Sequence, residues 1–384
     1  VATCSASMPN LSVMLLSSST SLYALKISVS SESIHSERVL NACPQLKKNQ
    51  APQMSGRCFT FSAHGPLYGL SWSCRTDMPM RLAISTISDA CPNEFSIISL
   101  QKERRDFRVV ASASVVYPLS KIQFLPSKDV SNPDLIATVS DSLRIFEIDN
   151  LKDDGRAELC SRGRLLVNET RPVPILSMDW CAHSLNIIMT ANLDTTVSLW
   201  DIYKQEVDIR FVAQERAVTD CCFSLKDPNR FLTCGAEGNL RLYDRRRMHV
   251  ANEIYTGNEA ILRAQFKPTD SNFITCFGEK STDIILLDAR STVKPLARLK
   301  GHTDYINGIS WGRDSHGGYF VSVANDGRAL IWDGGSGTYT PFMEYVATSA
   351  SGEPLGPINS VDWNQSNHDW VALTVDDEVQ ILHV

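Results

Sequence analysis

The stretch INGISW (306–311), YFVSVAN (319–325), ALIWD (329–333) and PFMEYV (341–346) decides the fold. Each segment is short, and its residues are either apolar throughout or alternate between apolar and polar. Such segments are typical of β-strands, whereas an amphipathic helix would need apolar residues at i, i+3 and i+4. The four segments therefore predict one sheet of four strands.

The same unit recurs along the chain from Cys58 onward. The first strand of each unit ends in an aromatic residue, and these residues are Trp72, Phe124, Trp180, Phe223, Phe266, Trp311 and Trp363. The third strands end near Phe146, Trp200, Tyr243, Leu287, Trp332 and Leu382. Four-stranded units that repeat at roughly 40–50 residues are typical of WD-type propeller blades. We therefore predict an all-β fold, a seven-bladed WD40 β-propeller over 58–384.

The last unit predicts how the ring closes. It contains only three strands, INSVDW (358–363), WVALTV (370–375) and EVQILHV (378–384). The segment CFTFSA (58–63) stands just before the first unit and can supply the missing outer strand. Closure in this way would cover the row of unpaired backbone N–H and C=O groups that an open blade leaves at its edge.

Residues 1–57 differ in composition from the rest of the chain. They include 13 serines, five Lys or Arg residues and only two acidic residues, Glu32 and Glu37. We expect a poorly ordered, serine-rich N-terminal extension. The alternative is an organelle transit peptide, which has a similar serine-rich, acid-poor composition but is usually rich in arginine as well.

Charge and cysteine content exclude several classes of protein. The 37 Lys and Arg residues against 43 Asp and Glu residues give a net charge of −6, which argues against a protein that binds nucleic acid directly. No apolar run is long enough to span a membrane. The 11 cysteines include no C-x-x-C pair, and several lie in apolar strands. We expect reduced, buried thiols in a protein of the cytoplasm and nucleus, with organelle import possible only if the extension is a transit peptide.

Three residues of the sixth unit, His302, Ser322 and Asp326, have the side chains of a serine-hydrolase triad. Their positions favour a structural network with Trp332, because they lie in the loop entering the blade, on its second strand and in the next turn. Related sets recur in two other blades, as Thr190, Asp194 and Trp200 and as Thr233, Glu237 and Tyr243. An active site is needed once, so a repeated set is interpreted as structural.

Other signatures of catalysis are missing from the sequence. It contains no G-x-x-x-x-G-K-[ST], no H-E-x-x-H and no G-x-S-x-G. We therefore expect no enzymatic activity, no cofactor and no metal site. A rigid ring with many loops is suited to docking partner proteins, and we expect a monomer within a larger complex. Asp304 and Tyr305, in a loop that enters a first strand, are candidate binding residues because exposed aromatic side chains often anchor interfaces.

The chain resembles the WD-repeat scaffold family of TRANSPARENT TESTA GLABRA and its animal counterparts, which associate with cullin-4 ligases and with kinases. The resemblance covers about 60–384 and lies in the segments PDLIATVSDSLRIFEI (133–148), DIILLDAR (283–290), ARLKGHTDYINGISW (297–311), GRALIWD (327–333) and INSVDWNQSNHDWVALTVDDEVQILHV (358–384). It implies a scaffold that recruits transcription factors or kinases and has no catalysis of its own.

The resemblance also implies a candidate adaptor site. Substrate receptors of cullin-4 ligases often end a third strand with an aromatic or apolar residue, then Asp, any residue and Arg. Tyr243, Asp244 and Arg246 match this pattern, and Asp288 and Arg290 match it after Leu287. The structural alternative is that both aspartates cap turns and that the arginines are solvated or paired within their blades.

Three functions remain open from the sequence. The first is a non-enzymatic scaffold for transcription-factor or kinase assemblies. The second is a substrate receptor of a cullin-4 ubiquitin ligase, and the third is a structural subunit of an organelle complex.

Overall fold

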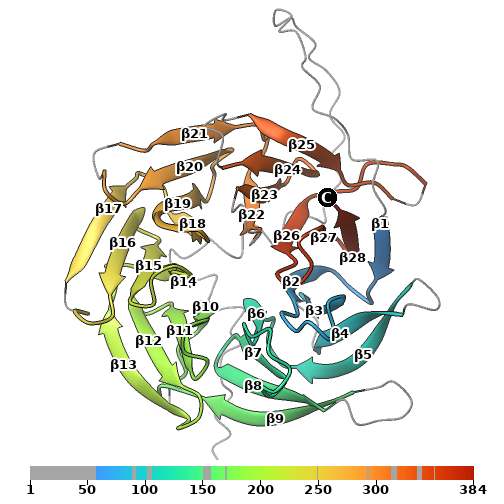
Figure 1. Cartoon of the computed structure of the whole chain (residues 1–384), viewed down its shortest axis with the longest axis horizontal. Helices are drawn as coiled ribbons and strands as arrows, with labels where there is room; N and C mark the ends of the chain where they lie inside the picture. The colour runs from blue at the N-terminus through green and yellow to red at the C-terminus, as the bar shows by residue number, and fades with distance from the viewer. Residues whose placement is uncertain are drawn as a thin grey trace, which may run out of the picture. The chain divides into compact units, whose positions relative to one another are not determined.

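The computed structural model describes residues 58–88, 92–101, 106–149, 157–168, 171–248, 250–291, 294–312, 318–334, 340–349 and 351–384. Within these ranges the chain forms seven antiparallel sheets of four strands each, arranged around a central axis (Figure 1). The predicted seven-bladed propeller is therefore confirmed. The expected extension over 1–57 lies outside the described residues and stays a prediction.

In the first four sheets the chain runs from the innermost strand outward. The first sheet holds β2 (Leu67–Trp72), β3 (Arg81–Thr86), β4 (Asn93–Gln101) and β5 (Asp106–Val115). The second holds β6 (Lys121–Phe124), β7 (Leu135–Val139), β8 (Leu143–Asp149) and β9 (Glu158–Leu165). The third holds β10 (Ile175–Trp180), β11 (Ile187–Asn192), β12 (Thr196–Asp201) and β13 (Glu206–Val212). The fourth holds β14 (Val218–Phe223), β15 (Arg230–Gly235), β16 (Asn239–Asp244) and β17 (Ala251–Thr256).

The remaining three sheets follow the same order. The fifth holds β18 (Ile261–Lys267), β19 (Asp270–Gly278), β20 (Asp283–Asp288) and β21 (Ala297–Lys300). The sixth holds β22 (Ile306–Trp311), β23 (Tyr319–Ala324), β24 (Arg328–Asp333) and β25 (Pro341–Val346). The seventh holds β26 (Ile358–Trp363), β27 (Trp370–Val375), β28 (Glu378–His383) and the early strand β1 (Cys58–Ser62).

Strand β1 closes the ring as predicted. It pairs antiparallel with β28, in a register that places Phe61 opposite Val379. Phe59 packs against Phe107 of the first sheet and Trp370 of the seventh, with ring centroids 5.9 and 5.6 Å apart. Strand β1 therefore covers the outer edge of the seventh sheet and also contacts the first sheet. It thus holds the first and last blades together.

The apolar core lies between neighbouring sheets. Seven clusters of buried residues each draw on two adjacent blades, including a cluster of the last and first sheets that contains Trp72 and Ile381. The aromatic residues that end the first strands lie in these clusters, and Trp72 is only 1% exposed. Burial of apolar surface at about 25 cal/mol per Å² is the main source of stability here, and the sheet-to-sheet contacts distribute it around the ring.

Side chains of the innermost strands also link the sheets through hydrogen bonds. Each accepts from a backbone N–H of the next first strand, at N···O distances between 2.7 and 3.1 Å. The acceptors are Gln123, Asp179, Asp220, Ser310 and Asp362, and the donors are Trp180, Phe223, Ala264, Trp363 and Trp72 in the same order. The Asp362 link joins the seventh sheet to the first and so reinforces the closure.

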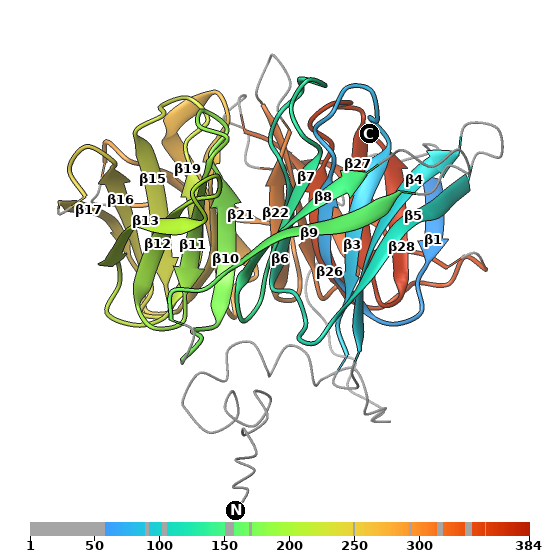
Figure 2. The same ribbon diagram turned by 90° about the horizontal axis from the view of Figure 1, so that it is seen from below.

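Strand alternation divides the loops between two faces, which the edge-on view shows (Figure 2). We call the Arg246 face the one formed by loops between the first and second strands and between the third and fourth strands of a sheet. We call the Tyr305 face the one formed by loops between the second and third strands and between one sheet and the next. Any loop residue can therefore be assigned to a face from its place in the strand order.

Candidate protein-docking surface

The triad-like residues of the sixth sheet form one buried hydrogen-bond network. His302 Nδ1 lies 3.1 Å from Asp326 Oδ2, and His302 Nε2 lies 2.8 Å from Ser322 Oγ. Trp332 donates its Nε1–H to the same Ser322 hydroxyl at 2.8 Å. The network thus connects the Asp326 carboxylate, the His302 ring, the Ser322 hydroxyl and the Trp332 indole in series. Ser322 is 0% exposed, so this hydroxyl cannot reach a substrate, and the network ties the strands of one blade to its entry loop.

The related set in the third blade keeps only part of this arrangement. Trp200 donates its Nε1–H to Thr190 Oγ1 at 2.9 Å, as the repeat predicts. Asp194 instead accepts from Thr196 Oγ1 and pairs with Arg210. These polar groups are therefore used within the blade, which favours the structural interpretation over a catalytic one.

In the fourth blade a different side chain takes the place of the histidine. Gln214 donates to Thr233 Oγ1 at 2.9 Å, while the Tyr243 hydroxyl donates to the backbone oxygen of Ala213 at 2.8 Å. Tyr243 is only 4% exposed. This burial corrects the prediction that its side chain contacts a partner, because Tyr243 is part of the blade core, where its ring stacks on Phe231.

The two Asp-x-Arg segments have the same geometry in adjacent blades. In the fourth blade, Arg246 Nε and Nη2 donate to both carboxylate oxygens of Asp244, with the shortest contact 2.6 Å from Nη2 to Oδ2. In the fifth, Arg290 Nε and Nη2 donate to Asp288 in the same way, with the corresponding contact at 2.7 Å. In both segments the arginine backbone N–H also bonds to the aspartate Oδ1.

These hydrogen bonds fix the charge and orientation of both arginines. Hydrogen bonds from the side chain and backbone of Arg246 lower the pKa of Asp244 to about 2, and the same arrangement at Arg290 lowers the pKa of Asp288. Both carboxylates are therefore ionised at neutral pH. The side chains of Arg246 and Arg290 nevertheless remain 70% and 62% exposed, so the rest of each guanidinium fork is presented to solvent. Such a fork matches the geometry of a carboxylate or of backbone carbonyls.

The candidate binding residues fall on opposite faces of the propeller. Arg246 and Arg290 lie between third and fourth strands and therefore on the Arg246 face. Asp304 and Tyr305 precede the first strand of the sixth sheet and lie on the Tyr305 face. Tyr305 is 40% exposed, and its backbone N–H bonds to Asp304 Oδ1 at 2.7 Å, which fixes the loop. A partner held by the two arginines and a partner held by Tyr305 would thus occupy different surfaces.

A set of exposed apolar side chains was missed at the sequence level. Each stands just before, or at the start of, an outermost strand on the Arg246 face, in four successive sheets. They are Tyr203 at 67% exposure, Val250 at 64%, Leu296 at 48% and Phe342 at 53%. Their signal in the sequence is a large apolar residue at or shortly before the start of a fourth strand. Together with Arg246 and Arg290 they give this face both apolar and cationic contact points.

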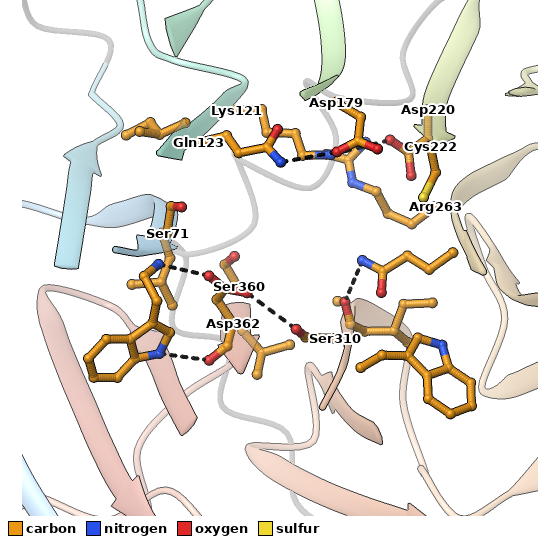
Figure 3. A pocket seen from close by; sticks show the side chains of 18 of the residues that line it. Ser71, Lys121, Gln123, Asp179, Asp220, Cys222, Arg263, Ser310, Ser360 and Asp362 are labelled. Carbon is orange, nitrogen blue, oxygen red and sulfur yellow. Dashed lines mark hydrogen bonds and ion pairs between the residues drawn. The ribbon is translucent and has the colours of Figure 1, made fainter. Parts of the chain in front are cut away.

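The central channel is lined by polar side chains of the innermost strands and encloses a cavity of about 220 Å³ (Figure 3). Asp220 accepts from Ser177 Oγ and from the backbone of Ala264, and it lies 3.7 Å from Lys121 Nζ. Burial alone would lower the pKa of Lys121, but the charges of Asp220 and Asp179 raise it, so the ammonium stays charged. The carboxylates of the channel accept hydrogen bonds from neighbouring blades, so we assign them a structural role.

The described cysteines are free thiols, and most of them are buried, whereas Cys58 is exposed. Burial raises the pKa of Cys276 to about 12 and raises the pKa of Cys221 and of Cys234 as well, so these thiols are unreactive. In the part of the chain that the structure describes, no group of three or more His, Cys, Asp or Glu side chains is placed to hold a metal ion. The same residues contain no helix with the length and hydropathy needed to cross a membrane.

Comparisons with known proteins agree with this fold. The family described as WD domain, G-beta repeat matches residues 293–333. The chain is 31% identical to the DDB1- and CUL4-associated factor 7 homolog of Dictyostelium discoideum over 333 residues, which cover 85% of this chain and 99% of that protein. It is 29% identical to a WD repeat-containing protein of Saccharomyces cerevisiae over 342 residues, which cover 80% of this chain and 63% of that protein.

A more distant likeness covers less of either chain. Protein SPA1-RELATED 3 of Arabidopsis thaliana is 23% identical over 247 residues, or 63% of this chain and 26% of that protein. The Dictyostelium protein, in contrast, is matched over nearly its whole length. This chain belongs to the WD-repeat family of the DDB1- and CUL4-associated factor 7 homolog.

Proposed function

We propose that this propeller is a non-catalytic scaffold that docks partner proteins on both faces, and that the Arg246 face binds a cullin-4 adaptor of the DDB1 kind. The observation that carries the proposal is the duplicated Asp-x-Arg geometry, which orients Arg246 and Arg290 in the same way on adjacent blades. The name of the Dictyostelium relative supports the choice of adaptor.

Both arginines can bind a partner with little loss of conformational entropy. A long side chain normally loses rotamer freedom on binding, at about 0.5–1.5 kcal/mol for each immobilised side chain. Arg246 and Arg290 are already held by their own aspartates, and Arg290 also lies over the ring of Phe273 at 5.7 Å. A partner that offers carboxylates or carbonyls at matching positions would therefore gain charge-assisted hydrogen bonds with little further ordering.

The exposed apolar side chains of the Arg246 face add apolar contact area to the charged contacts of the two arginines. Val250 and Leu296 stand in the same two loops as Arg246 and Arg290. Their exposure leaves apolar surface that binding would remove from water. An interface that combined these contacts would have the mixed composition common in protein complexes, with apolar contacts near arginines.

The test is capture of purified DDB1 by the wild-type propeller and by the double variant Arg246→Ala with Arg290→Ala. We expect capture to fall at least tenfold while the melting temperature stays close to that of the wild type, because both side chains are exposed. The matched control is Arg162→Ala with Arg164→Ala, which removes two exposed, paired arginines of β9. Undiminished capture by the first variant would refute the adaptor assignment.

The Tyr305 face could bind a second partner while the Arg246 face holds the adaptor. The resemblance to the TRANSPARENT TESTA GLABRA family suggests a transcription factor or a kinase, and Tyr305 is the exposed aromatic anchor on that face. Tyr305→Ala should weaken capture of such a partner and leave DDB1 capture unchanged. Equal loss of both partners in this variant would contradict the assignment of two separate faces.

A cellular location in the cytoplasm and nucleus is consistent with partners of this kind. The competing proposal, a structural subunit of an organelle complex, depends on residues 1–57, which lie outside the described ranges. Sequencing the N-terminus of the mature protein separates the two proposals. Cleavage near residues 40–57 would support import, whereas a retained extension would support the scaffold.

A further inference from the structure

The outer rim of the propeller contains a groove between the fourth and fifth blades. Its lining comes from β17 and from residues in and just before β21. Figure 1 shows these two strands as the outermost ones of neighbouring sheets. The volume of the groove is about 570 Å³, within the range of roughly 300–1,000 Å³ that is common for ligand sites. Its lining includes three charged residues, Glu253, Lys294 and Arg298, together with Tyr255 and Pro295.

The groove exists because the fifth sheet has a short outermost strand. Strand β21 has only four residues and pairs with β20 from Ala297 opposite Leu286 to Lys300 opposite Asp283. Lys294 and Pro295, which line the groove, precede this pairing. The adjacent β17 has six residues, and the groove lining follows it past its end to Asn258. At about 3.3 Å per residue, six residues span roughly 20 Å, so the groove can hold an extended segment of similar length.

The lining is basic in a protein that is acidic as a whole. Residues 290–300 contain four Lys or Arg residues and no acidic residue, although the whole chain has a net charge of −6. Lys294, Leu296, Arg298 and Lys300 are all exposed and occupy alternate positions, which places them on one side of the extended chain. Lys300 stands opposite Asp283 in the sheet, so its charge is partly balanced. The cations of the groove are therefore Lys294 and Arg298.

The wall formed by β17 and the residues after it supplies no ion-pair partner for Lys294 or Arg298. Among the described residues, no carboxylate lies within ion-pair distance of Lys294 or Arg298. Glu253, the acidic residue on the groove wall, is held by Arg241 at 3.4 Å and accepts from Thr256 Oγ1 at 2.7 Å. Arg298 Nη2 lies 3.5 Å from the Tyr255 hydroxyl, which places an aromatic ring beside the guanidinium.

We propose that this groove docks an extended acidic segment of a partner protein, with carboxylates on Lys294 and Arg298 and an apolar side chain against Tyr255. Charge complementarity decides the chemistry of the occupant, because a basic segment would meet two uncompensated cations. The Debye length is about 8 Å at physiological ionic strength, so the local cations outweigh the net negative charge of the rest of the protein. The site lies on the rim and does not depend on the adaptor assignment for the Arg246 face.

Fluorescence anisotropy with a synthetic probe tests this proposal on the full chain. The probe is a fluorescein-labelled heptapeptide with glutamate at alternate positions, leucine at its centre and serine elsewhere, titrated with protein up to 1 mM. We expect binding that falls at least tenfold in Lys294→Glu with Arg298→Glu. The same variant should gain affinity for a peptide that carries lysine in place of glutamate. Tyr255→Ala should weaken binding of the acidic peptide about threefold or more without changing the net charge.

The matched control is Lys128→Glu with Lys226→Glu, which makes the same change in net charge at exposed lysines elsewhere. It should bind the acidic peptide within twofold of the wild type. Absence of binding by the wild type, or an equal loss in the control variant, would overturn the proposal, since the second result would show only a general charge effect. Failure here leaves capture of DDB1 through Arg246 and Arg290 unaffected, because neither side chain lines the groove.

Discussion

Replacing Ser322 by alanine separates the structural from the catalytic interpretation of the His302, Ser322 and Asp326 set. In the structure the serine hydroxyl accepts from Trp332 Nε1 at 2.8 Å and lies 2.8 Å from His302 Nε2. Both partners are buried, since Trp332 is 1% exposed and the His302 side chain 0% exposed. Ser322→Ala would therefore leave two buried polar groups without a hydrogen-bond partner.

The size of the effect follows from those two lost bonds. A buried donor or acceptor left unsatisfied costs about 1–3 kcal/mol, so two of them should lower the free energy of unfolding by about 2–6 kcal/mol. At roughly 2 °C per kcal/mol for a chain of this size, the melting temperature should fall by about 4–12 °C. Differential scanning fluorimetry of the purified protein measures this shift directly.

The matched control is Ser85→Ala. Ser85 is also a buried serine of a second strand, but in the described structure its hydroxyl has no hydrogen-bond partner. The same chemical change should therefore leave the melting temperature almost unchanged or raise it slightly. If Ser322→Ala melts within 1 °C of the wild type, or if both variants lose equal stability, the hydrogen bonds of Ser322 do not stabilise the blade as inferred.

The sixth blade and the ring closure give two further predictions. Burial alone would raise the pKa of Asp326, but hydrogen bonds from His302 and Thr303 and the charge of Arg328 hold it well below its usual range. The ionised carboxylate thus stabilises the fold above about pH 4, and this stability is lost as the pH falls further. The melting temperatures of the wild type and Asp326→Asn should therefore differ most near pH 7 and converge below about pH 4; a gap that widens in acid would contradict this. A chain shortened to begin at Ala63 lacks β1 and should melt lower and self-associate in light scattering, whereas a chain beginning at Cys58 should remain monomeric, because only the first exposes the edge of β28. Equal behaviour of the two chains would count against closure by β1.

The blades could be predicted from the sequence because their signals are local and repeated. An aromatic residue such as Trp311 or Trp363 ends each first strand, and the apolar strands around it recur at a nearly constant spacing. Closure could also be predicted, since a last unit of three strands needs a fourth and CFTFSA (58–63) is placed to provide it. Tyr243 shows the limit of this reasoning: the pattern places it beside Asp244, but only the packing against Phe231 reveals that it is buried.

The links between blades could not be predicted because they join residues more than 40 positions apart. Asp362, for example, bonds to Trp72 across 290 positions, and the residues that make equivalent links vary among Asp, Gln and Ser. The rim groove could not be predicted either, since it depends on how late β21 begins and on how near β17 lies. The basic composition of 290–300 was visible, but it has no meaning until the structure shows that Glu253 on the other wall is already paired.

The hydrogen-bond pattern itself indicates which charged residues are available for partners. Arg81 forms two hydrogen bonds with Asp134 at 2.7 Å each, and this pair links the first two blades in a nearly dry environment. Arg246 forms an equally close pair, yet its aspartate stands two positions earlier, at the end of β16, so the bond joins no second blade. A short-range pair contributes nothing to joining blades, but it orients the guanidinium and leaves it 70% exposed. The Arg81–Asp134 pair thus helps to build the ring, whereas the guanidinium of Arg246 remains available for recognition.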